Sequence, residues 1–445
     1  MTTRWKRLGL GLLAGAAAMC AVSAEAATVI YHGFTLIDGS GTAPKADQAM
    51  VVDDAVITWV GPAKQVPRTP GAARVDLKRK YLMPGIVDLH IHIGTVRDLV
   101  QKEGYFTPDS VRKDLRTYAA FGVTTVQSMG TDKDSIIAIR DTGRKGPQTM
   151  ARLLTAGQGL VFKGGYGGVP GINHPVATPA EAAAEVDAQA KKGVDYIKLW
   201  MDDELGAMPK MPYSISKAII DAGHRNGKRV LAHVFYLADA KELVAQGIDG
   251  FMHSVRDKPV DAELIAAMKA RGVWQGAATL SREAAVYAFA ADNPRTRDPF
   301  FRQAADPATI AGLESPEREK TIATSRIYPA LPRIDEQARD NIMLLAKSGV
   351  KYGFGTDAGP PGRLPGYSEH WELEQLVKAG FTPAEAIHTA TARSAEWLGT
   401  NDRGLIAPGR LADFVVLNAD PTRDILNSRR IAAVYIGGSK VPSVR

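Results

Sequence analysis

The sequence predicts an α/β protein, a (β/α)8 TIM barrel with a small β-sandwich domain built from both ends of the chain. Between Pro84 and about residue 400, short apolar runs alternate with helical patterns, as in a parallel barrel. There are eight such runs, the number that a closed barrel needs. Histidine, lysine or aspartate ends several of them, and the functional groups of a barrel gather at this carboxyl end of its strands.

Residues 1–26 are predicted to be a signal peptide. A cationic start precedes an alanine-rich apolar stretch over residues 8–22, followed by the small-x-small motif Ala24-Glu25-Ala26. The apolar stretch is shorter than the roughly 20 residues of a membrane span, and an uncleaved anchor is the alternative. We therefore expect a periplasmic or secreted protein with no membrane attachment after cleavage. Cys20, the only cysteine, would be lost with the signal, which leaves no disulfide.

The composition favours a globular protein that acts on a small molecule. Of the 445 residues, 45% are hydrophobic and 23% are charged, which allows a sizeable core. The formal net charge is +7, but no long basic run with interleaved aromatic residues occurs after the N-terminus. We therefore expect no nucleic-acid partner.

Residues 27–84 and 404–445 are predicted to form the small β-domain together. Both segments contain short apolar strands separated by turns such as Asp38-Gly39-Ser40-Gly41. Neither segment makes a convincing domain alone. We therefore expect them to pair, with the barrel inserted between them.

Residues 85–403 are predicted to form the barrel. Its candidate strands are 86–92, 123–128, 152–156, 194–200, 229–234, 249–253, 273–279 and 351–357. Helical patterns lie between them, for example at 181–192, 262–271 and 336–347. The loops at 157–176 and 281–333 are unusually long, and long loops on the catalytic face usually shape the substrate pocket.

His90 and His92 are the first candidate metal ligands. They lie two residues apart at the end of an apolar run, so both side chains face the same side of a strand and can reach one ion. His-x-His alone is a weak signal. Here, matching residues end four later strands, namely Lys198, His233, His253 and Asp357. Their coincidence predicts one centre with two divalent metal ions at the carboxyl ends of the strands.

Lys198 is an unusual ligand, because a protonated amine repels cations. Burial beside metal ions favours the neutral amine, which can add carbon dioxide and become a carbamate. A carbamate is an anionic bidentate oxygen ligand that can bridge two ions. We therefore predict a carbon dioxide-derived carbamate on Lys198, and the alternative is an ordinary lysine at the edge of the barrel.

His233 and His253 are predicted to hold the second ion, and Asp357 the first. Zinc suits a mixed imidazole and carboxylate set best, with manganese, cobalt or nickel as alternatives. Paired ions acidify a bridging water and polarise a scissile carbonyl. Asp357 is therefore the predicted catalytic residue, which would accept the proton of the water and pass it to the leaving group.

With these motifs the chain resembles the amidohydrolase superfamily, in the branch with a bridging carboxylated lysine. The resemblance covers essentially the whole mature chain and rests on residues 82–92, 122–126, 355–359, 386–391 and 404–413. It implies the ligand roles given above, the small β-domain and often an oligomer, so a homo-oligomer is expected. The relatives include prolidase-like and ochratoxinase-like carboxypeptidases and imidazolonepropionase-like enzymes.

Two departures put a dipeptidase assignment in doubt. Peptidase-type members often carry Gly-Gly-His-Gly after the third strand, where this chain has Tyr166 in place of the histidine. They also tend to have a Gly-Gly turn soon after the lysine, where this chain reads Met201-Asp202-Asp203-Glu204.

Three residues are candidate substrate contacts. Tyr166 could donate a hydrogen bond to the substrate carbonyl or to the oxyanion, or be a structural residue of its loop. His174, in the same loop, could contact the substrate or only cap the loop. Arg256 could bind a substrate carboxylate or form a surface ion pair with Asp257. By contrast, His370 is expected to pack rather than to reach the pocket.

The leading interpretation is a hydrolase of amide-type carbon–nitrogen bonds that uses a metal-bridging hydroxide. Among enzymes, the alternative is an ester, lactone or phosphotriester hydrolase, since the same two-metal water can attack those centres. From a different class, the alternative is a non-catalytic metal-binding or solute-binding protein on the same fold. The intact ligand set, with its proton acceptor, argues against that last alternative.

Overall fold

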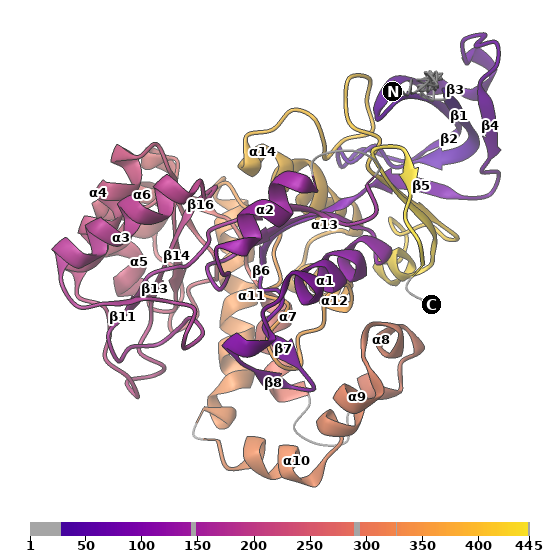
Figure 1. The fold of residues 1–445 in the computed structure, drawn as a ribbon. Coiled ribbons are helices and arrows are strands. Elements are labelled where there is room, and N and C mark those ends of the chain that lie inside the picture. Colours follow the sequence, from indigo (N-terminus) through magenta and orange to yellow (C-terminus); the bar gives the residue numbers. More distant parts are fainter. Residues whose placement is uncertain (1–27, 144–147, 289–293, 326, 444–445) are drawn as a thin grey trace, which may run out of the picture.

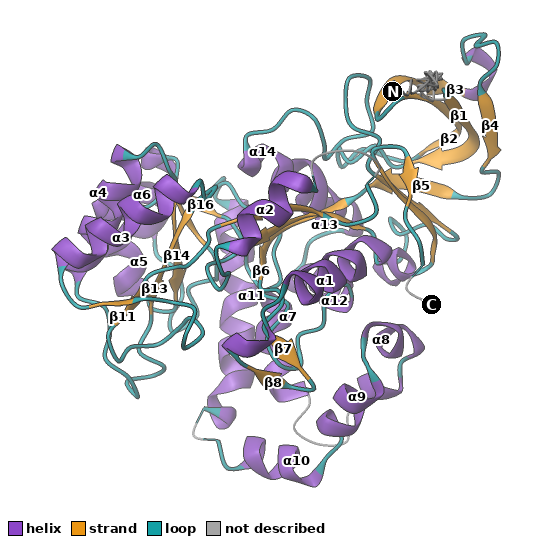
Figure 2. Ribbon diagram, viewed as in Figure 1, coloured by secondary structure: helices purple, strands orange, loops and turns teal. Residues whose placement is uncertain are grey.

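The computed structural model describes residues 28–143, 148–288, 294–325 and 327–443. The predicted signal peptide lies outside the described residues. Within them the protein is α/β, with helices packed around short strands (Figure 2). None of the described helices is both long enough and apolar enough to span a membrane.

Strands from both ends of the chain lie in one sheet (Figure 1, indigo and yellow). They are β1 Val29–Leu36, β2 Lys45–Asp53, β3 Val56–Pro62, β4 Ala73–Asp76, β5 Tyr81–Pro84, β17 Phe414–Leu417, β18 Ile431–Ile436 and β19 Ser439–Lys440. The order is β19-β18-β17-β5-β1-β2-β3, and β4 also pairs with β1. β17 runs antiparallel to β5, with Val415 opposite Met83. The pairings make one branched sheet, and the two layers of a sandwich are not confirmed.

The parallel strands that carry the candidate site follow one another in chain order, as in a barrel. They lie in two sheets, β6-β9-β10 and β13-β14-β15-β16. Their bounds are β6 Ile86–Ile91, β9 Val123–Ser128, β10 Arg152–Thr155, β13 Ile197–Met201, β14 Val230–Val234, β15 Gly250–Phe251 and β16 Trp274–Gln275. Asp195 N, just before β13, donates a hydrogen bond to Thr155 O of β10 at 2.8 Å.

The predicted eighth strand, residues 351–357, lies between β16 and β6 without forming a regular strand. Tyr352 bridges to Gln275 of β16, and Ala358 bridges to Ile91 of β6. Asp357 has a φ of 58°, a value that interrupts an extended backbone. These bridges join the two sheets of parallel strands, while a closed eight-stranded ring stays a prediction.

Helices lie between and after these strands in the chain and beside them in the fold (Figure 1). They are α1 Pro108–Ala120, α2 Ser135–Thr142, α3 Pro179–Lys192, α4 Tyr213–Arg225, α5 Leu237–Gln246, α6 Ala262–Arg271, α11 Leu331–Lys347, α12 Tyr367–Ala379, α13 Pro383–His388 and α14 Ser394–Leu398. Thr178 and Asp261 cap α3 and α6 by accepting hydrogen bonds from the third backbone N–H of each helix. Gly193 and Gly272 end the same helices in the left-handed conformation.

The long segment 281–333, predicted as a loop, is largely helical. It contains most of α7 Leu280–Ala288, all of α8 Pro299–Ala304, α9 Pro307–Leu313 and α10 Pro316–Ala323, and the start of α11. Proline opens α8, α9 and α10, directly after Asp298, Asp306 and Ser315. A polar cap followed by proline is a helix-start signal, so these three helices could have been predicted from the sequence.

Two short strand pairs lie beside the site region. The hairpin β7 Val96–Arg97 and β8 Val100–Gln101 carries Leu99 at its tip, which packs against the apolar cluster of α8 and α9. The predicted loop 157–176 contains the parallel pair β11 Val161–Phe162 and β12 Pro175–Val176. Both pairs belong to connections that follow strands of the predicted barrel.

Candidate metal centre

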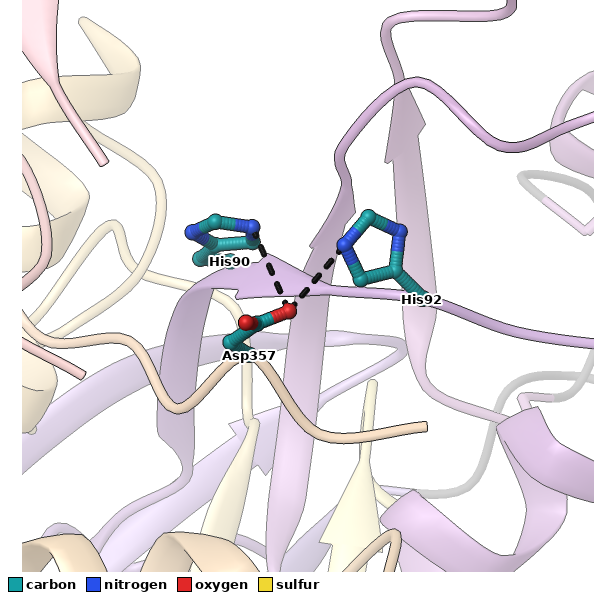
Figure 3. A group of neighbouring side chains, drawn as sticks. All are labelled: His90, His92 and Asp357. Atoms are coloured by element: carbon teal, nitrogen blue, oxygen red, sulfur yellow. Dashed lines mark ion pairs between the residues drawn. The ribbon is translucent and has the colours of Figure 1, made fainter. Parts of the chain in front are cut away.

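His90, His92 and Asp357 converge where β6 meets the segment 351–358 (Figure 3). Asp357 Oδ1 lies 3.1 Å from His92 Nε2 and 3.6 Å from His90 Nε2. All three residues are buried, and one ligand atom from each lies within 4.8 Å of the others. The backbone holds them together, because Asp357 N donates to His90 O at 2.7 Å. Two imidazoles and one carboxylate at this spacing fit a divalent cation.

Hydrogen bonds fix which nitrogen of His90 and of His253 is available. His90 Nδ1 donates to Met252 O at 2.7 Å. His253 Nδ1 lies 2.7 Å from Thr279 Oγ1, whose hydroxyl donates its proton to Ala278 O. The hydroxyl oxygen can therefore only accept from the ring, so His253 Nδ1 is the donor. In both rings Nε2 therefore keeps its lone pair. His90 Nε2 is buried and makes no hydrogen bond to a described residue, which is the state expected of a metal ligand.

His233 extends the cluster toward β14. Its ring centroid lies 4.1 Å from that of His253, which in turn lies 4.7 Å from that of His90. His233 Nε2 is 2.7 Å from Asp202 Oδ2. Burial raises the pKa of Asp202, but the hydrogen bond and charge of His233 outweigh it and lower that pKa, so the carboxylate is ionised. An ionised carboxylate only accepts, so His233 Nε2 carries the proton and Nδ1 is the nitrogen left for a metal.

All four imidazoles of the cluster are neutral near pH 7. Burial is the main cause that lowers the pKa of His90, His92, His233 and His253, to about 4 for His233. Neutral imidazole is the form that binds metal, and positive charge from a bound cation would lower these pKa values further.

Lys198 lies fully buried on β13, next to this cluster. Its Nζ makes no hydrogen bond to a described residue and lies 4.2 Å from the centroid of the Trp200 ring. Burial lowers the pKa of Lys198 to about 7, so a large share of the side chain is uncharged at neutral pH. The amine thus fulfils the condition for adding carbon dioxide.

The second oxygen of Asp357 faces two guanidinium groups. Arg282 Nε lies 3.0 Å from Asp357 Oδ2, and Arg363 Nη1 contacts the same oxygen. Burial alone would raise the pKa of Asp357, but Arg363 and the two histidines hold it well below its usual range. The ionised carboxylate thus turns one oxygen to the imidazoles and the other to the arginines.

Of the predicted substrate contacts, Tyr166 lies beside the cluster. Its ring centroid is 5.2 Å from that of His233, and Arg282 Nη2 lies 3.4 Å from its hydroxyl. Arg256 is also near, but its Nε pairs with Glu283 Oε1 at 2.9 Å. The alternative ion pair with Asp257 is therefore wrong.

Two other histidines considered from the sequence, His174 and His370, make their hydrogen bonds and ion pairs outside the cluster. The side chain of His174 is 62% exposed, and its Nδ1 lies 3.5 Å from Glu185 Oε2 of α3. This placement favours the structural role rather than contact with a substrate. His370 is buried in α12 and donates from Nε2 to Phe121 O at 2.9 Å, so it packs as expected.

Four charged residues of the site region were not predicted from the sequence, namely Asp202, Arg282, Glu283 and Arg363. Asp202 orients His233, and its position just beyond β13 is a strand-end signal like those of the ligands. Arg282 and Glu283 belong to α7, inside the segment that was read as a loop. No spacing relates these two to the ligands, so only the tertiary structure reveals them.

The α/β fold and this buried cluster of imidazoles, lysine and carboxylate define a protein with a candidate metal centre at the ends of its parallel strands. The chain belongs to the amidohydrolase family, whose model matches residues 81–441. This confirms the resemblance inferred from the motifs. Family membership implies a TIM barrel with an additional domain.

Individual relatives are distant. An uncharacterised protein of Mycobacterium bovis is 28% identical over 177 residues, which are 39% of this chain and 44% of that protein. The chain thus matches less than half the length of this relative. The imidazolonepropionase of Deinococcus deserti is 23% identical over 429 residues, with 89% of this chain and 92% of that protein covered. A solved structure of a provisionally assigned prolidase from Bifidobacterium longum is similar with a TM-score of 0.74 at 26% identity, covering 94% and 95% of the two chains.

Proposed function

We propose that the protein is a binuclear amidohydrolase that cleaves an amide-type carbon–nitrogen bond. The observation that carries the proposal is a pair of buried nitrogens, His90 Nε2 and Lys198 Nζ, which make no hydrogen bond to a described residue and lie in one cluster with neutral imidazoles. Leaving such groups buried without hydrogen bonds costs free energy, which bound cations would recover. The names of the relatives, an imidazolonepropionase and a prolidase, support a carbon–nitrogen bond as the target.

The donor set assigns each residue a role toward two divalent ions, with zinc as the best match. His90, His92 and Asp357 would hold the first ion, and His233 and His253 the second. A carbamate on Lys198 would bridge them. When bound, the two ions would supply an acidified bridging water and polarise the carbonyl of the substrate.

The protein's own groups then move the proton and orient the substrate. Asp357 is the one carboxylate of the set, and it is ionised, so it can accept the proton of the attacking water and return it to the leaving amine. Tyr166 would donate a hydrogen bond to the oxyanion formed from the carbonyl oxygen, a role supported by the contact of its ring with His233.

Hydrolysis of an ester, lactone or phosphotriester is the second candidate, because the same ligand set activates water for attack on those centres. A non-catalytic binding protein is the third. The complete ligand set with an ionised Asp357 favours an enzyme over a binder.

A screen of the zinc-loaded protein tests the proposal. N-acyl amino acids, dipeptides, aryl amides, lactones and phosphotriesters are offered side by side, each with and without a chelator. The proposal expects turnover of an amide class that chelation abolishes and zinc restores. Turnover only of esters or phosphotriesters would support the second candidate, and metal binding without any turnover would support the third.

Three further features belong to the same proposal. We expect the parallel strands to close into an eight-stranded barrel, supported by the bridges that join β16 and β6 through residues 351–358. We also expect export to the periplasm or beyond after removal of residues 1–26, and a homo-oligomer. Our expectation for the mature protein is a small-molecule substrate, with neither nucleic acid nor membrane as a partner.

A further inference from the structure

Lys198 and Trp200 lie two residues apart on β13, so their side chains leave the same side of the strand. Lys198 Nζ is 4.2 Å from the centroid of the indole ring and makes no hydrogen bond to a described residue. Lys198 is fully buried and Trp200 is 5% exposed. Since no such hydrogen bond holds the amine, packing orients it, and the indole is part of that packing.

Three glycines from three separate segments make room for the indole of Trp200. Gly130 follows β9, Gly159 follows β10, and Gly167 comes directly after Tyr166. A Cβ atom would lie 2.4 Å from the indole Cγ at Gly167, 2.5 Å from Cζ3 at Gly159 and 3.0 Å from Cη2 at Gly130. Heavy atoms do not pack against a Cβ atom at less than 3.0 Å, so a side chain at Gly159 or Gly167 would displace the ring. These three glycines form the indole slot.

Asn173 ties the segments of the indole slot together. Its side-chain amide donates hydrogen bonds of 2.7 Å to Gly130 O and to Gly159 O. Its Oδ1 accepts a hydrogen bond of 2.8 Å from Val169 N, two residues after Gly167. Asn173 is itself buried, so hydrogen bonds away from solvent fix the slot.

The indole also acts on the lone pair of the amine. The face of an aromatic ring is negative, so it attracts N–H groups and repels a lone pair. An amine that turns an N–H toward Trp200 therefore directs its lone pair away from the ring. When carbon dioxide adds, this lone pair forms the new N–C bond, one C=O electron pair moves to oxygen, and the amine releases a proton to water. The reverse step needs that proton back, so a slot that excludes water slows it.

We infer that Trp200 is a positioning residue that holds the Lys198 amine for the addition of carbon dioxide, and that the indole slot seats its ring. The inference rests on the proposed function, from which it takes the carbamate. It also links the carbamate to the loop of Tyr166, because Gly167 lies against the same ring.

Titration with ¹³C-bicarbonate tests the inference. The carbamate carbon of the zinc-reconstituted protein is followed by NMR, and Lys198→Ala identifies its signal. In Trp200→Leu, the bicarbonate concentration for half-maximal signal should rise by about 10- to 100-fold, the usual effect of losing a residue that orients a metal ligand. Trp200→Phe keeps an aromatic face and should show a smaller rise.

The control is Trp274→Leu, which removes another buried indole. The ring of Trp274 lies 5.1 Å from Lys351 Nζ and belongs to β16, so the control also loses a contact between lysine and tryptophan. Urea unfolding measures the stability of each variant. Trp274→Leu should lose stability but keep the bicarbonate dependence of the wild type. A rise of the same size in both variants would assign the effect to lost stability and would overturn the inference.

Gly159→Ala provides a test that keeps the indole but displaces it, and it decides the matter if Trp200→Leu does not fold. The backbone of Gly159 lies outside the left-handed region, so alanine is compatible with its φ, while the new methyl group meets Cζ3 of the ring. The half-maximal bicarbonate concentration should rise here too. Gly104→Ala is the matched control, because a Cβ atom at Gly104 has nothing within 4 Å.

The failures of the two proposals are distinguishable. An unchanged bicarbonate dependence in Trp200→Leu or in a folded Gly159→Ala would overturn the role of Trp200 and leave the proposed function intact. A wild type without a carbamate signal would refute both the inference and the carbamate bridge. A carbamate signal without turnover of any amide would count against the proposed function alone.

Discussion

Asp202 Oδ2 lies 2.7 Å from His233 Nε2 and accepts a hydrogen bond from it. This bond keeps the proton on Nε2 and leaves the Nδ1 lone pair for the candidate centre. Asp202 is itself fixed, because its Oδ1 accepts hydrogen bonds from the backbone N–H groups of Asp203 and Glu204. The orientation of a ligand on β14 thus depends on the turn that follows β13.

Asp202→Ala should therefore weaken binding of the second ion by about 10- to 100-fold, the usual effect of removing the partner of a metal-bound histidine. Competition with a chromogenic chelator would measure the zinc affinity of each site. The control is Asp203→Ala, since Asp203 accepts from Tyr236 and contacts no imidazole of the cluster. Equal zinc affinities in both variants would show that Asp202 does not orient His233.

Lys198→Ala should remove bound metal and most activity, because the bridging oxygen ligand is lost with the amine. Short carboxylic acids should restore part of the activity by taking the place of the carbamate. Growth or reconstitution with ¹³C-bicarbonate should give a carbamate carbon signal in the wild type and none in the variant. Lys217→Ala, an exposed lysine paired with Asp221, is the control. Full metal content and activity in Lys198→Ala would contradict the prediction.

Asp357→Asn should keep much of its metal but lose turnover by a factor of about 100 to 10,000, the range of general acid–base catalysis. Asparagine retains an oxygen that can coordinate, yet it cannot accept a proton at neutral pH. The loss should appear in kcat rather than mainly in KM, because the proton moves as the transition state forms. Metal analysis beside steady-state kinetics gives the answer, and a near-normal kcat would exclude Asp357 as the proton acceptor.

The contribution of Glu372 to the stability of the metal-free protein should fall as the pH rises from about 5 to 8. Burial raises the pKa of Glu372 from 4.5 to about 8. A carboxyl whose pKa is raised by folding contributes stability that is complete below its unfolded pKa and is lost as the pH rises toward its folded pKa. Each such group makes the free energy of unfolding fall by up to about 1.4 kcal/mol per pH unit between its two pKa values.

Glu372→Gln should remove this contribution, so the wild type should lose stability relative to the variant as the pH rises from about 5 to 8. Urea unfolding of the chelator-treated protein at several pH values would measure it. The control is Glu374→Gln, because Glu374 lies on the same helix but pairs with Arg429 near the surface. An identical slope in wild type and Glu372→Gln would show that the carboxyl does not change its ionisation on folding.

Export should remove the first 26 residues. N-terminal sequencing of the protein recovered from the periplasm or medium should begin at residue 27, after the small-x-small motif. An intact Met1 on protein confined to the cytosol would refute the signal peptide.

The ligand positions could be predicted because a parallel barrel places strand ends on one face, which turns distant residues into neighbours. That rule alone was enough to predict that His90, His92 and Asp357 lie close together, and the structure brings them together. The hydrogen-bond partners of the ligands were harder to predict from the sequence. Thr279 has a positive φ of 57°, and it follows a strand that is regular for only two residues, so no periodicity marks it.

Sequence patterns predicted the residues that surround the candidate metal centre less well than its ligands. Arg256 was noticed because it follows His253 closely, but its partner Glu283 lies on α7. Which of several arginines faces a ligand depends on which carboxylates neutralise the others, and that is decided by tertiary packing. The sequence therefore identified the ligands of the centre better than the groups that would select a substrate.

The pairing of β17 with β5 has a consequence for synthesis of the chain. Only Gly85 separates β5 from β6, and Gly85 N donates to Asp413 O at 3.0 Å, so the strand that carries His90 is anchored by a segment made more than 300 residues later. A nascent chain cannot complete this anchor until the ribosome has passed residue 417. This anchor of the His90 strand is thus completed only late in synthesis. If the chain is exported, as we propose, the delay would help to keep it unfolded for translocation and would postpone metal loading.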